Sequence, residues 1–165
     1  LSEKNIQRII LEAKKNNIPV TADPKKENFH HYHGVSLFKP NLKELKEGLN
    51  IDFSFENERN AFETAVQNLR KAVPHEASLV TLSEYGVYIC NESEKAYIEA
   101  HKREITDVSG AGDTVIAVAT LCLLANAPID VIAKIANIAG GMVCEKPGVV
   151  SISFEELKDE VHELL

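Results

Sequence analysis

The feature that most limits the fold of this chain is its alternation between short apolar runs and longer stretches with helical spacing. Apolar runs bounded by turn residues predict buried strands at residues 18–23, 35–38 and 78–82. The stretches between them place apolar residues three or four positions apart, as one face of a helix requires. This order predicts an α/β fold with a mainly parallel sheet, helices on its faces and a ligand crevice at the carboxyl ends of the strands.

The helical stretches also carry start and stop signals. Ser2 is suited to cap the first helix, Asn16-Asn17 ends it, Pro40-Asn41 introduces the second, and Pro74 stops the third. Residues 24–34 and 50–56 are expected to be loops. The apolar faces are expected to be Ile6, Ile9, Ile10 and Ala13 in the first helix, Leu42, Leu45 and Leu49 in the second, and Phe62, Ala65, Val66, Leu69, Ala72 and Val73 in the third.

The second half of the chain departs from strict alternation. Residues 86–90 and 95–100 alternate like the strands of a hairpin at a sheet edge. Helices are then expected at about 112–125 and 128–143, both apolar enough to be largely buried, and a capped helix from Ser153 closes the chain. The hairpin is an antiparallel addition to the parallel sheet.

Composition supports one globular domain and excludes several partners. The chain has 165 residues, of which 44% are hydrophobic, which is enough for a sizeable core. No linker divides the sequence. A net charge of −7 argues against a broad nucleic-acid or anionic-membrane surface, because either needs a basic face. No apolar run approaches a membrane span and no signal segment opens the chain, so we expect a soluble, cytoplasmic protein.

Residue types that bind metals are present, but their spacing is not that of a metal centre. The three cysteines lack CxxC spacing and lie in apolar surroundings, so they are interpreted as reduced core thiols. The histidines of the HHYH run are adjacent in a loop, where side chains rarely converge on one ion. These residues are Cys90, Cys122 and Cys144, and His30, His31 and His33.

The run from Asp107 to Thr114, DVSGAGDT, predicts a phosphate site at the start of a helix. Gly110 and Gly112 allow successive backbone N–H groups to turn toward one point, and the helix adds the positive end of its dipole. Asp113 follows directly, where bound phosphate would otherwise disfavour a carboxylate. It therefore suggests a base beside a phosphoryl group in transfer.

Three other interpretations of this run compete with the phosphate site. The dinucleotide fingerprint G-x-G-x-x-G fails because Val115 occupies the third glycine position, and no Walker A sequence is present. A plain strand-to-helix turn capped by Asp113 remains an alternative from local sequence.

Motifs elsewhere in the chain resemble those of ribokinase-like (PfkB-type) carbohydrate kinases. They occur in family order and are Asn41-Leu-Lys-Glu44, Thr81-Leu-Ser-Glu-Tyr-Gly86 and Asp107-x-x-Gly110-Ala111-Gly112-Asp113. Within that family the chain is most similar to bacterial heptose 7-phosphate kinase domains, often fused to an adenylyltransferase that makes ADP-heptose. The segments behind this are Ala22-Asp23-Pro24-Lys25, Phe29-x-x-Tyr32-x-Gly34, Lys39-Pro-Asn41 and residues 107–118.

The resemblance implies a three-layer αβα core and assigns the central chemistry. Asp113 would be the catalytic base that takes the proton of a sugar hydroxyl as it attacks the γ-phosphate of ATP. Gly110, Ala111 and Gly112 would form the anion hole that neutralises charge on the transferred group.

The resemblance also implies a magnesium-bound nucleotide. Asn41 and Glu44 lie one helical turn apart, so both can face the same water shell of Mg²⁺. For Asn41 a helix N-cap is the competing interpretation. Thr81, Ser83 and Gly86 would line the phosphates and ribose of ATP, with Ser83 standing where relatives often carry glycine.

The remaining assignments are peripheral to the chemistry. Asn137 matches a position bordering the adenine, against the alternative of a helix-packing amide. Asp107 and Ser109 match positions that help to hold a monovalent cation, K⁺, in some members, with carbonyls of Lys146 and Gly148 on the other side. Lys25 is a candidate contact for the phosphate of the substrate.

The expected function is ATP-dependent phosphorylation of a sugar or sugar phosphate. The resemblance implies D-glycero-β-D-manno-heptose 7-phosphate as substrate and the 1,7-bisphosphate as product, on the route to ADP-heptose and the lipopolysaccharide core. Residues 1–165 would be the nucleotide-binding, carboxyl-terminal portion of one kinase domain, whose amino-terminal part, with its sugar contacts, lid and homodimer interface, is absent.

Two features of the chain set limits on this expectation. Leu1 opens the chain and its only methionine is Met142, so we expect an upstream segment in the parent and little activity of the chain alone. The rival classes are a dinucleotide-dependent oxidoreductase and a noncatalytic or truncated ATP-binding module with another sugar.

Overall fold

A small parallel sheet forms the centre of the first of two units, Leu1–Thr81, in the computed structural model, which describes residues 1–165. Its strands, paired in this order, are β1 (Thr21–Ala22), β2 (Leu37–Phe38) and β3 (Ala77–Thr81). Ala22 lies opposite Phe38, and Leu37 lies opposite Ala77. A parallel bridge between Asn41 and Thr81 continues the pairing beyond the end of β2.

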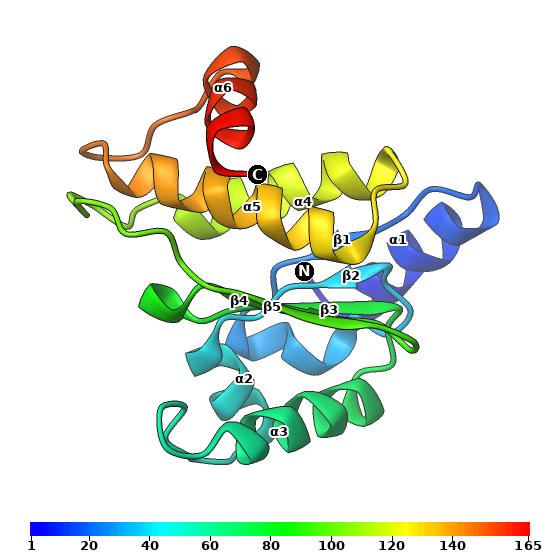
Figure 1. Ribbon diagram of the computed structural model, residues 1–165. Coiled ribbons are helices and arrows are strands. Elements are labelled where there is room, and N and C mark those ends of the chain that lie inside the picture. Colours follow the sequence, from blue (N-terminus) through cyan, green and yellow to red (C-terminus); the bar gives the residue numbers. More distant parts are fainter. The chain divides into compact units, whose positions relative to one another are not determined.

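The helices of this unit are amphipathic and bury the faces that pack on the sheet and on each other. They are α1 (Glu3–Lys15), the 3₁₀ helix η1 (Lys26–His31), α2 (Leu42–Leu49) and α3 (Arg59–Ala72). Helices α2 and α3 lie side by side, and α1 lies beside η1 (Figure 1). The ring of Phe62 in α3 packs against the rings of Phe53 and Phe55 from the preceding loop, so that loop contributes to the core.

Several boundaries in the first unit differ from the sequence predictions. The predicted strand at 18–23 shortens to β1 because Pro19 has no N–H to donate, and Ile18 is 58% exposed. The predicted loop at 24–34 contains η1, which buries Phe29. Ile9 is exposed although its spacing placed it on the buried face of α1, where only Ile6 and Ile10 are buried.

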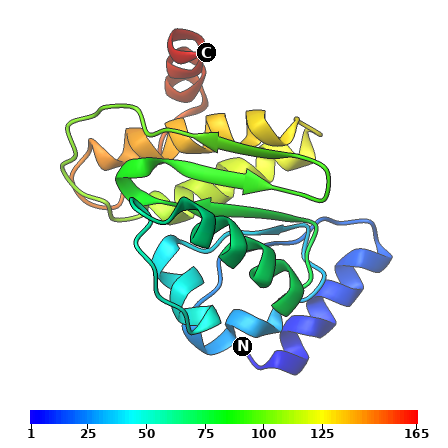
Figure 2. The ribbon, with the colours of Figure 1, turned by 60° about the horizontal axis from the view of Figure 1, so that its bottom comes forward.

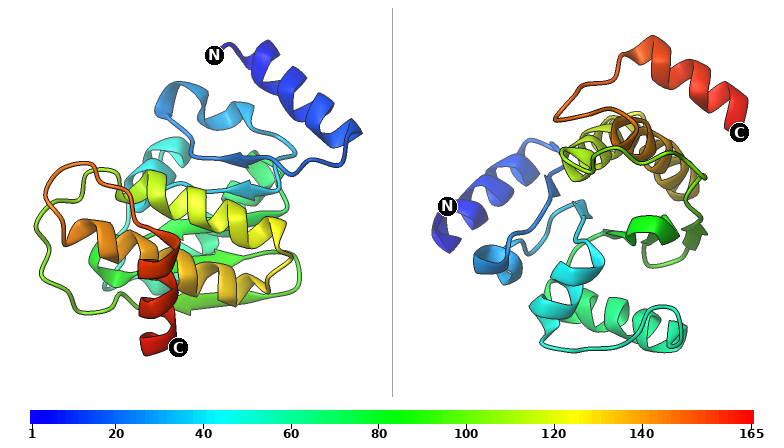
Figure 3. Two further views of the ribbon diagram at one scale, coloured as in Figure 1. Left: turned by 90° about the horizontal axis from the view of Figure 1, so that it is seen from above. Right: turned by 90° about the vertical axis from the view of Figure 1, so that its left-hand side faces the viewer.

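The second unit, Leu82–Leu165, consists of an antiparallel hairpin and three helices. Its elements are η2 (Ser83–Tyr85), β4 (Val87–Cys90), β5 (Lys95–Ile98), α4 (Ala111–Leu124), α5 (Ile129–Cys144) and α6 (Phe154–Leu164). Helix α5 packs on both strands of the hairpin (Figure 2), and α4 lies alongside α5 (Figure 3). The predicted hairpin and the three predicted helices are all confirmed.

Helix α5 is largely buried, as predicted, but α4 is not. Leu121 and Leu124 on one side of α4 are 67% and 55% exposed, although the helix is apolar nearly all round. At the helix starts, Ser153 caps α6 in a capping box with Glu156. Ser2 stands at the N-cap of α1, but its side chain accepts no capping hydrogen bond, contrary to the prediction.

The three cysteines are free thiols, of which Cys90 and Cys144 are buried. Burial raises the pKa of the Cys144 thiol, as expected of a core cysteine. None of the helices has the length and apolar character needed to cross a membrane.

Candidate active site

The start of α4 has the geometry of an anion-binding turn. Gly110 adopts φ +80° and ψ −5°, a left-handed conformation that favours glycine, immediately before the helix. Its carbonyl accepts the first helical hydrogen bond from Thr114 N at 2.9 Å, and Ala111 N donates to Val108 O at 3.2 Å. The next two N–H groups, of Gly112 and Asp113, belong to the first turn, where a helix supplies no backbone acceptor. These two groups and the helix dipole suit a phosphate oxygen.

Asp113 lies in this first turn with its side chain exposed. Its carboxylate accepts no hydrogen bond from the backbone at the start of α4, so the structure does not support the interpretation of Asp113 as a cap. The carboxylate is therefore open to a ligand beside the turn. Its role as a base remains a prediction.

Asp107 fastens the loop before α4 to the loop after α5. Its Oδ1 accepts a hydrogen bond from Ser109 N at 2.9 Å, and its Oδ2 accepts one from Gly148 N at 3.1 Å. The pKa of the Asp107 carboxyl lies below its ordinary value. The largest cause is a hydrogen bond from the side chain of Ser109, followed by bonds from the backbone N–H groups of Ser109 and Gly148. Cys144 O at the end of α5 accepts bonds from the N–H groups of Thr106 and Asp107. The structure thus brings Asp107, Ser109 and Gly148 together through N–H donors to the carboxylate, and a monovalent cation site there stays a prediction.

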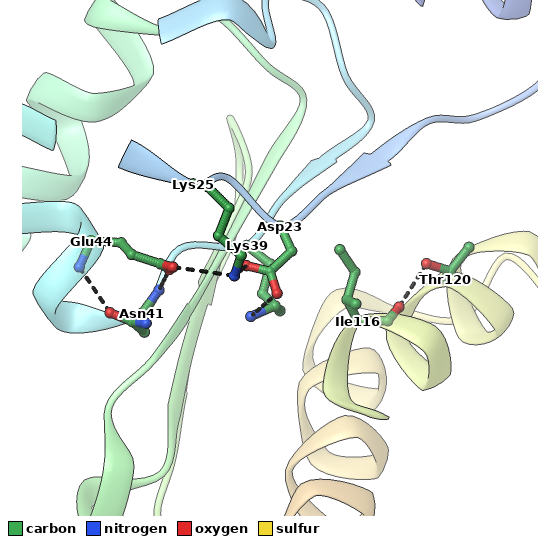
Figure 4. A network of polar contacts seen from close by, with 7 residues as sticks. All are labelled: Asp23, Lys25, Lys39, Asn41, Glu44, Ile116 and Thr120. Atoms are coloured by element: carbon green, nitrogen blue, oxygen red, sulfur yellow. Dashed lines mark hydrogen bonds and ion pairs between the residues drawn. The ribbon is translucent and has the colours of Figure 1, made fainter. Parts of the chain in front are cut away.

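Asn41 and Glu44 form a complete capping box at the start of α2. Asn41 Oδ1 accepts from Glu44 N, and Glu44 Oε2 accepts from Asn41 N, both at 2.8 Å (Figure 4). The N-cap interpretation of Asn41 is confirmed. The box leaves Asn41 Nδ2 and Glu44 Oε1 outside it, and the bridge from Asn41 to Thr81 places these residues at the carboxyl ends of β2 and β3. This is the edge where an α/β sheet binds ligands.

The turn after β3 requires unusual backbone conformations. Ser83 has φ +55°, in the left-handed region where relatives were expected to carry glycine. Gly86 has φ +92°, and a Cβ there would lie 2.0 Å from Ile98 O. Gly86 is therefore required by the close approach of its own hairpin partner, a reason that the sequence did not reveal.

Asn137 on α5 donates a hydrogen bond from Nδ2 to Glu99 O at 2.9 Å. This contact joins α5 to the segment after β5. The packing-amide alternative therefore describes its geometry, and an adenine contact stays a prediction.

A second polar cluster, largely missed by sequence reasoning, lies at the ends of β1 and β2. Lys39 Nζ is 3.3 Å from Asp23 Oδ2, and Lys25 Nζ is 3.7 Å from Asp23 Oδ1 (Figure 4). Lys25 Nζ is also 3.6 Å from Glu44 Oε1. The sequence does carry a signal for this cluster, because a charged residue directly follows each apolar strand. Asp23 follows β1, and Lys39 follows β2.

The histidine run does not assemble a ligand set. His30 Nε2 contacts Gly48 O at 2.8 Å and His31 Nδ1 contacts Asn28 Oδ1 at 3.3 Å, so the two rings are turned to different partners. No group of three or more His, Cys, Asp or Glu side chains in the chain is placed to hold a metal ion.

Comparison with known proteins defines the family. The family model described as pfkB family carbohydrate kinase matches residues 1–156. The chain therefore belongs to the pfkB family of carbohydrate kinases, as its motifs predicted. It is 40% identical over 96% of its length to the bifunctional protein HldE of Campylobacter jejuni strain RM1221, and 36% identical over 98% to that of Methylobacillus flagellatus.

Solved structures show the same fold. Phosphofructokinase-2 from Escherichia coli in complex with potassium matches 99% of this chain with a TM-score of 0.88 at 20% identity. Arabidopsis thaliana ribokinase complexed with ribose and ATP matches 97% with a TM-score of 0.81 at 17% identity. The fold is ribokinase-like, as predicted. The chain spans 33% of the C. jejuni relative and 53% of each of these two solved chains.

Each unit thus contributes its own set of predicted residues. In the first unit, Lys25, Glu44, Asn41 and Thr81 lie along one edge of the parallel sheet. In the second, Asp107, Ser109 and Gly148 are joined by hydrogen bonds next to the turn that carries Asp113.

Proposed function

We propose that this chain is the nucleotide-binding and base-bearing part of an ATP-dependent sugar kinase. The acceptor is O1 of D-glycero-β-D-manno-heptose 7-phosphate and the product is the 1,7-bisphosphate. Family membership supports the reaction class, and the similarity to HldE proteins supports the heptose. The observation that carries the proposal is the open first turn of α4, with an exposed carboxylate beside unbonded N–H groups.

The backbone and side-chain groups at that turn would play different parts in the reaction. The N–H groups of Gly112 and Asp113 stabilise negative charge on the transferred phosphoryl oxygens, which is usually the largest catalytic contribution. Asp113 accepts the proton of the sugar hydroxyl as that oxygen attacks. Asp107 holds the adjoining loops in place through Ser109 and Gly148. Asp107 and Ser109, with the carbonyls of Lys146 and Gly148, would accommodate a monovalent cation.

The proposed nucleotide contacts lie at and beyond the carboxyl ends of the strands. Asn41 Nδ2 and Glu44 Oε1 lie outside the capping box and suit the water shell of a magnesium ion. Mg²⁺, when bound with ATP, neutralises charge on the β- and γ-phosphates. Thr81 and the turn containing Ser83 and Gly86 would line the phosphates and ribose, and Asn137 would border the adenine.

The two units would together form the carboxyl-terminal portion of one ribokinase-like kinase domain. The relatives are longer than the matched segment, and we assign most sugar contacts and dimerisation to the rest of the complete polypeptide. Lys25 is the contact that this chain would make with the phosphate of the acceptor sugar.

An acceptor panel tests the proposal. The complete polypeptide that carries this chain is assayed for ADP release with MgATP and heptose 7-phosphate, fructose 6-phosphate or ribose, and ³¹P NMR locates the new phosphate. We expect kcat/KM to favour the heptose by on the order of 100-fold. A preference for another sugar would refute the heptose assignment, and ATP binding without transfer to any sugar would support the noncatalytic alternative.

A further inference from the structure

Four charged side chains alternate in sign at the carboxyl ends of β1 and β2, and the last of them, Glu44, is joined to Asn41 by the capping box. This edge network consists of Lys39, Asp23, Lys25, Glu44 and Asn41 (Figure 4). Asn41, Glu44 and Lys25 belong to the proposed function. Asp23 and Lys39 have no part in that function.

The register of two strands brings Asp23 and Lys39 together. Ala22 lies opposite Phe38, and Lys39 N donates to Ala22 O at 2.8 Å, so Asp23 and Lys39 each follow a paired residue. Residues at the same level on neighbouring parallel strands direct their side chains to the same face. The ion pair is therefore fixed by the backbone.

Lys39 is the most deeply buried charged group of the chain's first unit. Its side chain is 2% exposed and that of Asp23 is 16% exposed. Burying an ion pair removes both charges from water, so such a pair is a weak source of stability and an apolar pair often serves as well. A buried ion pair at the ligand-binding ends of the strands is better explained by its electrostatic effect on neighbouring side chains.

The neighbouring group is Lys25. Asp23 Oδ1 is buried and accepts no hydrogen bond, and Lys25 Nζ lies 3.7 Å from it. The distance from Lys25 Nζ to Glu44 Oε1 is 3.6 Å. Both distances exceed the usual hydrogen-bond range, so these two contacts are purely Coulombic. The Lys25 side chain is 67% exposed, so a dissolved anion can reach it.

Resting on the proposed function, in which Lys25 contacts the phosphate of the acceptor sugar, we propose that Lys39 is a positioning residue that acts through Asp23. By pairing with one carboxylate oxygen, Lys39 neutralises most of the charge of Asp23. Asp23 then directs the ammonium of Lys25 without binding it tightly. Without Lys39, the full charge of Asp23 would hold Lys25 back from the phosphate.

A double-mutant cycle in the complete polypeptide tests this inference. Lys39→Met should raise KM for heptose 7-phosphate by about 10-fold, and Lys25→Ala by roughly 10–100-fold, the range of a charge-assisted contact. Values of kcat and of KM for ATP should stay within about 2-fold. The double variant should match Lys25→Ala, because Lys39 acts only through Lys25. Lys39→Arg keeps the charge, although the larger group will strain this buried position, and should therefore raise KM less than Lys39→Met does.

Two variants separate positioning from folding. Ser78→Ala removes another buried polar group of the same unit and should change stability but not KM. If Lys39→Met does not fold, Lys39→Met combined with Asp23→Leu removes both charges at once. In that pair no charge at position 23 holds Lys25 back, so KM should rise by less than in Lys25→Ala, and adding Lys25→Ala should bring KM to the value of Lys25→Ala alone.

Additive effects of Lys39→Met and Lys25→Ala, or effects limited to kcat or stability, would overturn the inference. If the unmodified polypeptide is an active kinase and Lys25→Ala leaves KM for heptose 7-phosphate unchanged, Lys25 does not contact the phosphate and this inference is wrong. The assignment as a kinase would still hold. Absence of phosphoryl transfer by the unmodified polypeptide would instead refute the proposed function itself.

Discussion

His75 shows how a single buried side chain can make stability depend on pH. Val73 O can only accept, so Nδ1 donates to it, and in the neutral ring Nε2 accepts from Ser78 Oγ at 2.5 Å. The ring packs against Phe38 with centroids 5.2 Å apart. Burial, and to a lesser extent the charge of Arg70, lowers the pKa of His75 from 6.5 to about 4.

We predict that His75 makes the protein less stable as the pH falls from 6.5 toward 4. The folded-state pKa lies below the ordinary value, so in this window the unfolded chain binds the additional proton. The loss should approach about 3 kcal/mol, the free-energy equivalent of the pKa difference. Urea unfolding at pH 7.5, 5 and 4 measures it.

His75→Gln, which cannot titrate, should lose less stability than the unmodified protein over the same range. His33→Gln, at an exposed position, serves as the control and should follow the unmodified protein. An identical loss in all three proteins would assign the effect to other groups.

At the scale of an element, the β4–β5 hairpin depends on Gly86. We predict that Gly86→Ala destabilises the protein by about 3 kcal/mol, because its Cβ would lie 2.0 Å from Ile98 O and the residue has a positive φ. Gly148→Ala is the matched control, with φ +75° but no atom within 4 Å of the added Cβ, and should lose only about 1 kcal/mol. Thermal unfolding compares them. Equal losses would mean that conformation, and not the close contact, decides the result.

Most elements could be predicted because their signals are local. Helices α2 and α3 and the hairpin follow from spacing, proline and capping residues. Burial was harder to predict, because it depends on neighbours that the local pattern does not specify. The apolar residues Ile18, Leu121 and Leu124 are exposed despite patterns that indicated buried elements.

The same distinction applies to the candidate site. The capping box of Asn41 and Glu44 joins residues three apart, so sequence spacing was enough to place them together. The bond from Gly148 N to Asp107 joins residues 41 positions apart and was not predicted, because only the family resemblance had placed these two residues near one site. The pair of Asp23 and Lys39 depends on the register of β1 and β2, which no sequence pattern specified.

At the scale of the whole molecule, the residues assigned to one reaction are divided between two units. Asn41, Glu44 and Thr81 belong to Leu1–Thr81, whereas the turn carrying Asp113 belongs to Leu82–Leu165. Phosphoryl transfer depends chiefly on positioning and electrostatic stabilisation, so under the proposed function we expect neither set to suffice alone. Because the chain spans 33% of a close relative in the family, the reaction should be measured on the complete polypeptide.

The most direct test of this account is Asp113→Asn in that complete polypeptide. The substitution keeps the size of the side chain and the N–H groups of the α4 turn but removes the base. We predict that ATP affinity stays within about 3-fold of the unmodified protein, since the backbone groups persist, while turnover falls by at least ~100-fold. Near-normal turnover would contradict the assignment of Asp113 as the catalytic base.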